Sequence, residues 1–147
     1  MKKKIIATLI LVLAIVGIFY IVDRMKYTSF KEVILNTVNK DDVARIVIDR
    51  HPDNAKVSIE NKVIVKKILD DFERMELKKE NVSMRIGDYA IRIYSNNKDG
   101  FGLEFFKDNA YVRINNGMKT DIYKIVNSID PVKIIEDKNL DWYFPDK

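Results

Sequence analysis

The longest apolar run in the chain lies close to its N-terminus. Ile5 to Val22 is 18 residues long, is mostly apolar and contains no charged residue. An α-helix of that length spans about 27 Å, close to the hydrocarbon thickness of a bilayer, which is about 30 Å. The run has no polar face, so it does not suit a helix at the surface of a folded core. We therefore expect a membrane-spanning helix.

The charges around this run predict its orientation. Lys2, Lys3 and Lys4 precede it without any acidic residue, whereas the residues that follow, Asp23 to Lys26, carry both signs. The positive-inside rule then places the N-terminus in the cytoplasm and the remainder outside, as a single-pass protein of the cell membrane. A cleaved signal peptide is the alternative, but bulky side chains stand where a signal peptidase prefers small ones.

After the apolar run, the pattern alternates between helical and strand spacing. A capping box at Ser29 begins a short helix from Phe30 to about Val38, and Val43 to Arg50 is a β-branched, alternating run typical of a strand. Alternation resumes from Asn54 to Glu60, so the residues between form a hairpin loop.

That loop contains His51-Pro52-Asp53, the tripeptide that J-domain cochaperones carry between two helices. A J-domain needs a long basic helix before this tripeptide, whereas β-branched residues, which lose rotamer freedom in a helix, precede it here. Pro and Asp also suit a turn. We therefore interpret the tripeptide as a hairpin turn.

A second helix and a set of strands complete the pattern. Asn61 is a plausible cap for a helix to Met75, whose apolar residues recur on one side. Four alternating strands are expected next, followed by a helix that Thr120 caps and that ends before Pro131. The strands are Val82 to Ile86, Tyr89 to Ile93, Phe101 to Phe105 and Ala110 to Ile114.

The order anchor, helix, two strands, helix, four strands, helix predicts an α+β fold, in which one antiparallel sheet carries helices on one face. We expect residues 1–26 to form the anchor with its cytoplasmic lysines, and residues 27–147 to form one extracytoplasmic domain.

The strand from Val43 to Ile48, the hairpin to Glu60, the helix from Lys62 to Met75 and the strands from Tyr89 to Ile114 carry a resemblance. In this pattern the chain resembles a group of small, N-terminally anchored, extracytoplasmic proteins of low-GC Gram-positive bacteria with a TATA-binding-protein-like α+β domain. The resemblance implies a location and a fold, and it brings no catalytic residue with it.

Composition narrows the chemistry. The chain has no Cys and a single His, which excludes disulfides, thiolate chemistry and polyhistidine metal centres. Without the three anchor lysines, the formal net charge of +4 falls to about +1, so the expected domain lacks the charge of a nucleic-acid-binding protein. We expect neither a cofactor nor a metal ion.

The sequence contains none of the common enzyme signatures, such as G-x-S-x-G, H-E-x-x-H or a Walker loop. Asp41-Asp42 and Asp70-Asp71 are paired carboxylates, but the pattern places the first pair in a linker and the second on a polar helix face. Acid-base catalysis needs converging carboxylates with limited exposure to water. We expect no enzyme activity, although a pocket that gathers Asp41, Asp42 or His51 would favour an envelope enzyme of unfamiliar type.

The strand alternation identifies one candidate interaction face, because side chains that alternate with the core residues point away from the helices. Arginine and aromatic side chains are enriched on surfaces that bind partners. The candidate residues are Arg85, Arg92, Tyr94, Phe106, Tyr111 and Arg113. The alternative is that these side chains only stabilise the sheet, or that the tail containing Trp142, Tyr143 and Phe144 covers them.

The function we expect is that of a non-enzymatic accessory domain of the cell envelope, which binds an envelope protein through this face. A sensor of an anionic wall polymer or of a small ligand is an alternative. The membrane contact is assigned to Ile5 to Val22.

Overall fold

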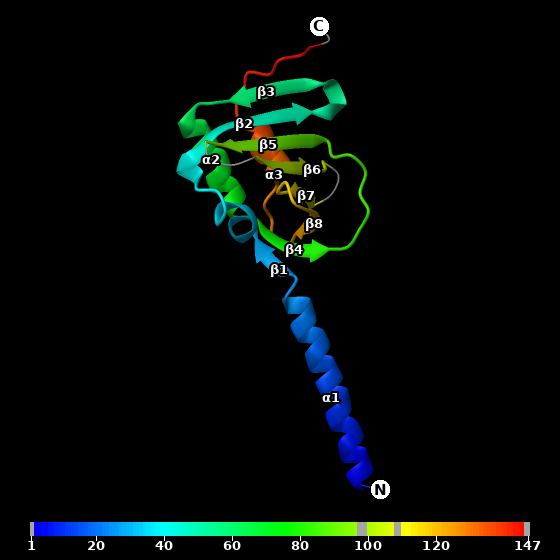
Figure 1. The fold of residues 1–147 in the computed structure, drawn as a ribbon. Helices are drawn as coiled ribbons and strands as arrows, with labels where there is room; N and C mark the ends of the chain where they lie inside the picture. Colours follow the sequence, from blue (N-terminus) through cyan, green and yellow to red (C-terminus); the bar gives the residue numbers. More distant parts are fainter. Residues whose placement is uncertain (1, 97–99, 108–109, 146–147) are drawn as a thin grey trace.

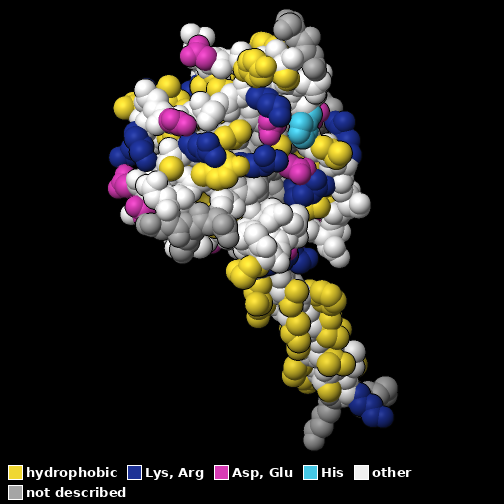
Figure 2. Space-filling view, turned by 45° about the horizontal axis from the view of Figure 1, so that its top comes forward, with side chains coloured by type: hydrophobic (Ala, Val, Ile, Leu, Met, Phe, Trp, Pro, Cys, Tyr) yellow, Lys and Arg dark blue, Asp and Glu magenta, His cyan; other side chains and the backbone are white. Residues whose placement is uncertain are grey.

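An isolated N-terminal helix and a mixed α+β body make up the protein. In the computed structural model the described residues are 2–96, 100–107 and 110–145. Helix α1 (Lys2–Arg24) projects from the body and contacts it at its last turn, where Asp23 pairs with Lys78 (Figure 1). Its segment Lys4–Arg24 contains an 18-residue window with a mean hydropathy of 3.1 and is long and apolar enough to cross a membrane. Figure 2 shows this helix as an apolar rod, in contrast to the mixed charges on the body.

The body contains one antiparallel sheet of eight strands in the order β1-β4-β8-β7-β6-β5-β2-β3. Figure 1 shows β1 beside the end of α1 and β3 at the far end of the sheet, so the sheet extends away from α1. The bounds are β1 (Tyr27–Ser29), β2 (Val43–Arg50), β3 (Ala55–Ile59), β4 (Glu76–Glu80), β5 (Tyr89–Ser95), β6 (Phe101–Phe105), β7 (Tyr111–Asn115) and β8 (Thr120–Ile125).

Two α-helices, α2 (Lys62–Glu73) and α3 (Pro131–Glu136), pack on one face of the sheet and bury the core. Phe72 of α2 contacts Phe30 and Phe105 edge to face, with ring centroids 5.7 and 5.4 Å apart. The side chains that alternate on the other strand face are less buried, and we call that side the outer face. The protein therefore has the predicted α+β architecture.

Several predicted elements are confirmed at their ends as well as in their type. Strand β2 covers the predicted range, and His51–Asp53 forms a single 3-10 turn that leads into β3. Asn54 adopts the left-handed conformation at φ 55°, which Asn tolerates better than most residues. The Asn61 side chain accepts hydrogen bonds from the amides of Val63 and Ile64, as an N-cap should. The HPD tripeptide is therefore a hairpin turn.

The predicted helix from Phe30 to Val38 is shorter in the structure. Only Lys31–Leu35 is helical, as one wide turn of π type. The Ser29 hydroxyl accepts a hydrogen bond from the Glu32 amide at 3.2 Å, which is half of the predicted capping box. The Glu32 carboxylate accepts from the Thr28 hydroxyl instead of closing the box.

Three further predictions are wrong. Val82 to Ile86 is no strand but an irregular segment, whereas Glu76–Glu80, expected to end α2, is strand β4. The predicted helix after Thr120 is strand β8, because Tyr123 and Ile125 point into the core and alternate with the less buried Ile122 and Lys124. Pro131 does not end a helix but begins α3, where its missing N–H costs nothing and Asp130 is the N-cap.

Candidate interaction face

The outer face is hollowed over strands β5, β6 and β7. The hollow has a volume of about 510 Å³, and we call it the outer-face hollow. Its lining includes Ala90, Arg92, Tyr94, Gly100, Gly102, Glu104, Arg113, Asn115, Gly117 and Thr120. Of the predicted interaction residues, Arg92, Tyr94 and Arg113 lie around this one cavity.

Two small residues form the floor of the outer-face hollow. Ala90 lies on β5, and Gly102, the second residue of β6, lies opposite Arg92. A Cβ atom added to Gly102 would meet only Asn115, at 3.6 Å, which is an ordinary contact. Internal packing therefore does not require the glycine. Glycine weakens a strand and often marks a place where another molecule approaches the backbone.

The β5 side of the hollow carries the accessible cations. The Arg92 side chain is 60% exposed, and its only ion pair found among the described residues is a long one of 4.0 Å to Asp49. Arg45, on the neighbouring strand, lies over the Tyr94 ring at 4.6 Å from the ring centre. Such stacking holds the guanidinium in place while its edges stay available for an anion.

The opposite side of the hollow is closed by Arg113, which is 20% exposed. Its guanidinium pairs with Glu104 and donates hydrogen bonds to the carbonyls of Met84 and Arg85, at 2.7 and 2.9 Å. The irregular segment 81–87 therefore crosses the outer face, and Arg113 ties it to β7. Gly87 lies so close to Glu104 of β6 that a Cβ atom at position 87 would meet the Glu104 Cβ at 2.9 Å, so the approach requires glycine.

The other predicted face residues lie elsewhere. Phe106 is only 2% exposed, since the sheet alternation ends before it and its ring lies under Arg113 at 5.7 Å. Arg85 lies on the crossing segment, 3.6 Å from Asp88, and Tyr111 lies on the outer face of β7 but does not line the hollow. The prediction missed Arg45 and Gly102. Alternation in β2 would have placed Arg45 on the outer face, and a glycine inside a predicted strand would have drawn attention to Gly102.

The C-terminal tail does not cover the hollow in the part that the structure describes, which ends at Pro145. Tyr143 forms a two-way backbone bridge with Lys56 on the edge of β3, with both hydrogen bonds at 2.8 Å. Arg50 lies over the Trp142 ring at 4.3 Å. The tail therefore protects a sheet edge and leaves the hollow open.

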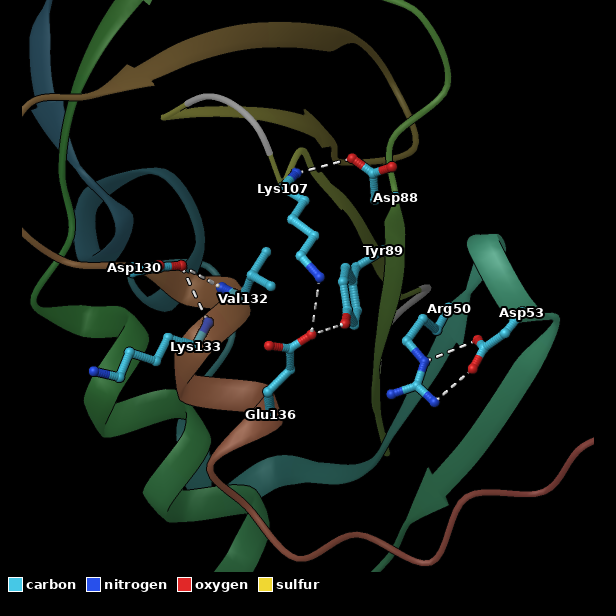
Figure 3. A network of polar contacts seen from close by, with 9 residues as sticks. All are labelled: Arg50, Asp53, Asp88, Tyr89, Lys107, Asp130, Val132, Lys133 and Glu136. Atoms are coloured by element: carbon cyan, nitrogen blue, oxygen red, sulfur yellow. Dashed lines mark hydrogen bonds and ion pairs between the residues drawn. The ribbon is translucent and has the colours of Figure 1, made fainter.

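The HPD residues are engaged in local contacts. The Asp53 carboxylate accepts two hydrogen bonds from the Arg50 guanidinium, at 2.9 and 2.8 Å (Figure 3). These bonds lower the pKa of Asp53. The His51 Nδ1 atom lies 2.6 Å from the Gly87 carbonyl oxygen, so the ring donates its proton there. Asp53 therefore stabilises the hairpin turn itself, and His51 ties the turn to the crossing segment at Gly87.

A second network joins α3 to the sheet. The Tyr89 hydroxyl donates to the Glu136 carboxylate at 2.5 Å, and Lys107 approaches the same carboxylate at 3.9 Å (Figure 3). Burial, followed by the negative charge of Glu136, raises the pKa of Tyr89 to about 12. This tyrosine therefore keeps its proton and acts as a structural donor.

The paired aspartates lie at another pocket, of about 650 Å³, between the segment before β2 and α2. Asp41, Asp42 and Asp70 line it, so the structure does bring acidic residues of both pairs together. Lys40 binds Asp70 at 2.6 Å and also binds Glu73. The hydrogen bond from Lys40 lowers the pKa of Glu73, so this group stays ionised at neutral pH.

The remaining aspartate, Asp71, pairs with Lys138 at 2.8 Å. Within the described ranges, no group of three or more His, Cys, Asp or Glu side chains is arranged to hold a metal ion.

Comparison with known proteins adds no relative, since no family model, no curated protein and no solved structure matches this chain. The resemblance to anchored proteins of Gram-positive bacteria therefore stays a prediction.

Proposed function

We propose that this protein is a membrane-anchored, extracytoplasmic interaction domain that binds an anionic group of an envelope partner in the outer-face hollow. The observation that carries the proposal is the exposed Arg92 beside Tyr94, in a hollow that Ala90 and Gly102 also line. Internal packing does not require the glycine at position 102.

The anchor supports the location. Helix α1 has apolar side chains exposed all round, which a water-soluble protein would not leave uncovered. The lysines before the apolar run favour a cytoplasmic N-terminus, so the body is placed outside.

The chemistry of the hollow supports an anionic ligand. Arg92 and Arg45 present two guanidinium groups, whereas the nearby carboxylates are already occupied. Arg113 takes up Glu104, and Lys56 pairs with Asp49 at 3.4 Å. A carboxylate or phosphate of a protein or wall polymer would therefore meet net positive charge and an aromatic wall.

The test is photocrosslinking in intact cells from a photoreactive amino acid at position 94, with position 66 on the solvent side of α2 as the comparison site. We expect a discrete partner from position 94 that is lost in Arg92→Ala and retained in Arg74→Ala, a matched arginine on the helix side. The same adducts from both positions, or adducts that Arg92→Ala leaves unchanged, would contradict the proposal.

An envelope enzyme is a second candidate, because the pocket at Asp41 and Asp42 gathers carboxylates from two elements. The engagement of Asp70 and Glu73 by Lys40 makes it the weaker one. A deletion phenotype that Arg92→Ala complements but the Asp41→Asn, Asp42→Asn double variant does not complement would favour the enzyme.

A further inference from the structure

The base of the body is fastened to the end of α1. The Lys78 ammonium lies 2.9 Å from the Asp23 carboxylate in the last turn of α1, and the Lys79 amide donates to the Lys26 carbonyl at 2.8 Å. Only Met25 and Lys26 separate α1 from β1. If α1 lies in a membrane, this base is therefore held at the level of the lipid headgroups.

Lysines at the base share too few carboxylates. Asp23 is within ion-pair distance of Lys26 and Lys78, at 3.8 and 2.9 Å. Asp121 is shared in the same way by Lys79 and Lys119, at 2.8 and 3.1 Å. Each pair of lysines thus keeps one positive charge uncompensated.

The half-exposed ammonium groups lie above a carboxylate that is mostly buried. The side chains of Lys79 and Lys119 are 50% and 64% exposed, whereas that of Asp121 is 16% exposed. An ammonium group has three donors, so one acceptor from the protein leaves others for a ligand outside.

Lys26 and Lys79 line a cavity of about 630 Å³, which we call the base hollow, and Lys119 lies beside it, 3.1 Å from the lining residue Asp121. It is lined by Lys26, Lys79, Glu80, Asn81, Val82, Thr120, Asp121 and Ile122. Basic side chains at the base outnumber acidic ones by two, even with Glu80 included. The five basic residues are Arg24, Lys26, Lys78, Lys79 and Lys119, and the three acidic residues are Asp23, Glu80 and Asp121.

An apolar side chain lies next to this charge. Met118 is 91% exposed at the turn between β7 and β8, directly before Lys119. A basic surface with an exposed apolar side chain is suited to the boundary between headgroups and acyl chains.

We infer that the base hollow binds the phosphate of an anionic lipid headgroup and thereby holds the body in one orientation on the membrane. The inference rests on the proposed insertion of α1. The two hollows share Thr120, but Arg92 and Tyr94 lie on β5, farther from the base in the strand order. Docking at the base would therefore leave the β5 side of the outer-face hollow accessible to a partner.

The experiment uses the full chain in nanodiscs of phosphatidylcholine, with or without phosphatidylglycerol. A fluorophore at Met118→Cys reports proximity to a quencher on the lipid headgroup. We expect stronger quenching with phosphatidylglycerol, and a docked-to-undocked ratio that falls about fivefold for each lysine removed in Lys79→Gln, Lys119→Gln. Lys66→Gln, Lys67→Gln on α2 should respond like the parent protein.

Equal quenching in both lipid mixtures would overturn the inference, as would a phosphatidylglycerol response that the Lys79→Gln, Lys119→Gln variant retains. If that variant does not fold, Lys119→Gln alone, at a more exposed position, should show the loss. Failure of the chain to enter nanodiscs at all would instead refute the proposed anchor, so the two failures are distinguishable.

Discussion

At the scale of single residues, the outer face contains arginines with two different tasks. Alternation predicts that Arg92 and Arg113 point away from the helices, and both do. It does not predict that Arg113 is occupied by Glu104 and by two carbonyl groups of the crossing segment, because that segment was expected to be a strand. Arg113 therefore stabilises the fold, and Arg92 remains available for binding.

Arg113→Ala should lower the free energy of unfolding by about 2 kcal/mol, because it leaves the partly buried Glu104 without its cation and removes two hydrogen bonds to the crossing segment. Arg92→Ala, at an exposed position with one long ion pair, should change it by less than about 0.5 kcal/mol. Chemical denaturation of both variants checks this contrast. Equal losses would mean that the two arginines do not differ in role.

The raised pKa of Tyr89 predicts a pH dependence. The pKa is about 12 in the folded protein and about 10 when the chain is unfolded, so the native state holds this proton more tightly. The stability from this interaction is complete below pH 10 and is lost as the pH rises from about 10 through about 12.

Ultraviolet titration should therefore show one tyrosine that ionises near pH 12, and Tyr89→Phe should remove it. Tyr89→Phe should also lower the free energy of unfolding by about 1 kcal/mol at neutral pH, because the hydrogen bond to Glu136 is lost. A full set of ordinary tyrosine ionisations in the parent protein would show that Tyr89 is not held by Glu136 in this way.

At the scale of elements, prediction succeeded where propensity and packing agree. The β-branched run of β2 and the Asn-capped apolar stripe of α2 are confirmed. It failed where a local pattern satisfies two periods: the Ile residues of β8 fit helical spacing, but pairing with β4 and β7 makes them a strand. The alternating Val82 and Ile86 have no neighbouring strand to pair with, since the crossing segment lies on the sheet face.

The outer-face hollow was predicted only in part for the same reason. Alternation assigns Arg92, Tyr94 and Arg113 to one face of the sheet. The depth of the hollow depends on which strands lie next to one another, and alternation does not predict that order. Arg45 lies over the lining residue Tyr94 because β2 pairs with β5, a pairing between distant parts of the sequence that no local pattern predicts.

The N-cap of α3 gives a prediction at this scale. The Asp130 carboxylate accepts from the amides of Val132 and Lys133, at 3.0 and 3.1 Å, and replaces the bonds that a first helical turn lacks. Asp130→Ala should lower the free energy of unfolding by about 1 kcal/mol. Asp137→Ala, at the other end of the same helix, should cost less, because an acidic side chain is unfavourable near a helix C-terminus. Thermal unfolding compares the two, and an equal or larger loss for Asp137→Ala would contradict the capping role.

At the scale of the whole molecule, the sheet extends away from the end of α1, the proposed anchor. Strand β1 follows α1 after two residues, and β3 lies at the far end of the sheet with the tail on its edge. A short connection and a fixed sheet order would set the height of the outer-face hollow above the membrane.

The proposed sidedness can be tested in cells, because the chain has no native Cys. Lys67→Cys, on the exposed side of α2, should react with a membrane-impermeant maleimide in intact cells. Lys4→Cys, before the apolar run, should react only after lysis. The reverse pattern would place the body in the cytoplasm and would exclude an extracytoplasmic partner.

The most direct test of the central claim is to fill the outer-face hollow from its floor and to measure the yield of the partner adduct from position 94. Gly102→Val adds a side chain into the hollow and should not weaken β6, since valine favours strands. Ser58→Val adds a similar side chain to the outer face of β3, outside the hollow. We predict that Gly102→Val abolishes the adduct while Ser58→Val retains it. An adduct that survives in a folded Gly102→Val protein would contradict the claim that the partner binds in the hollow.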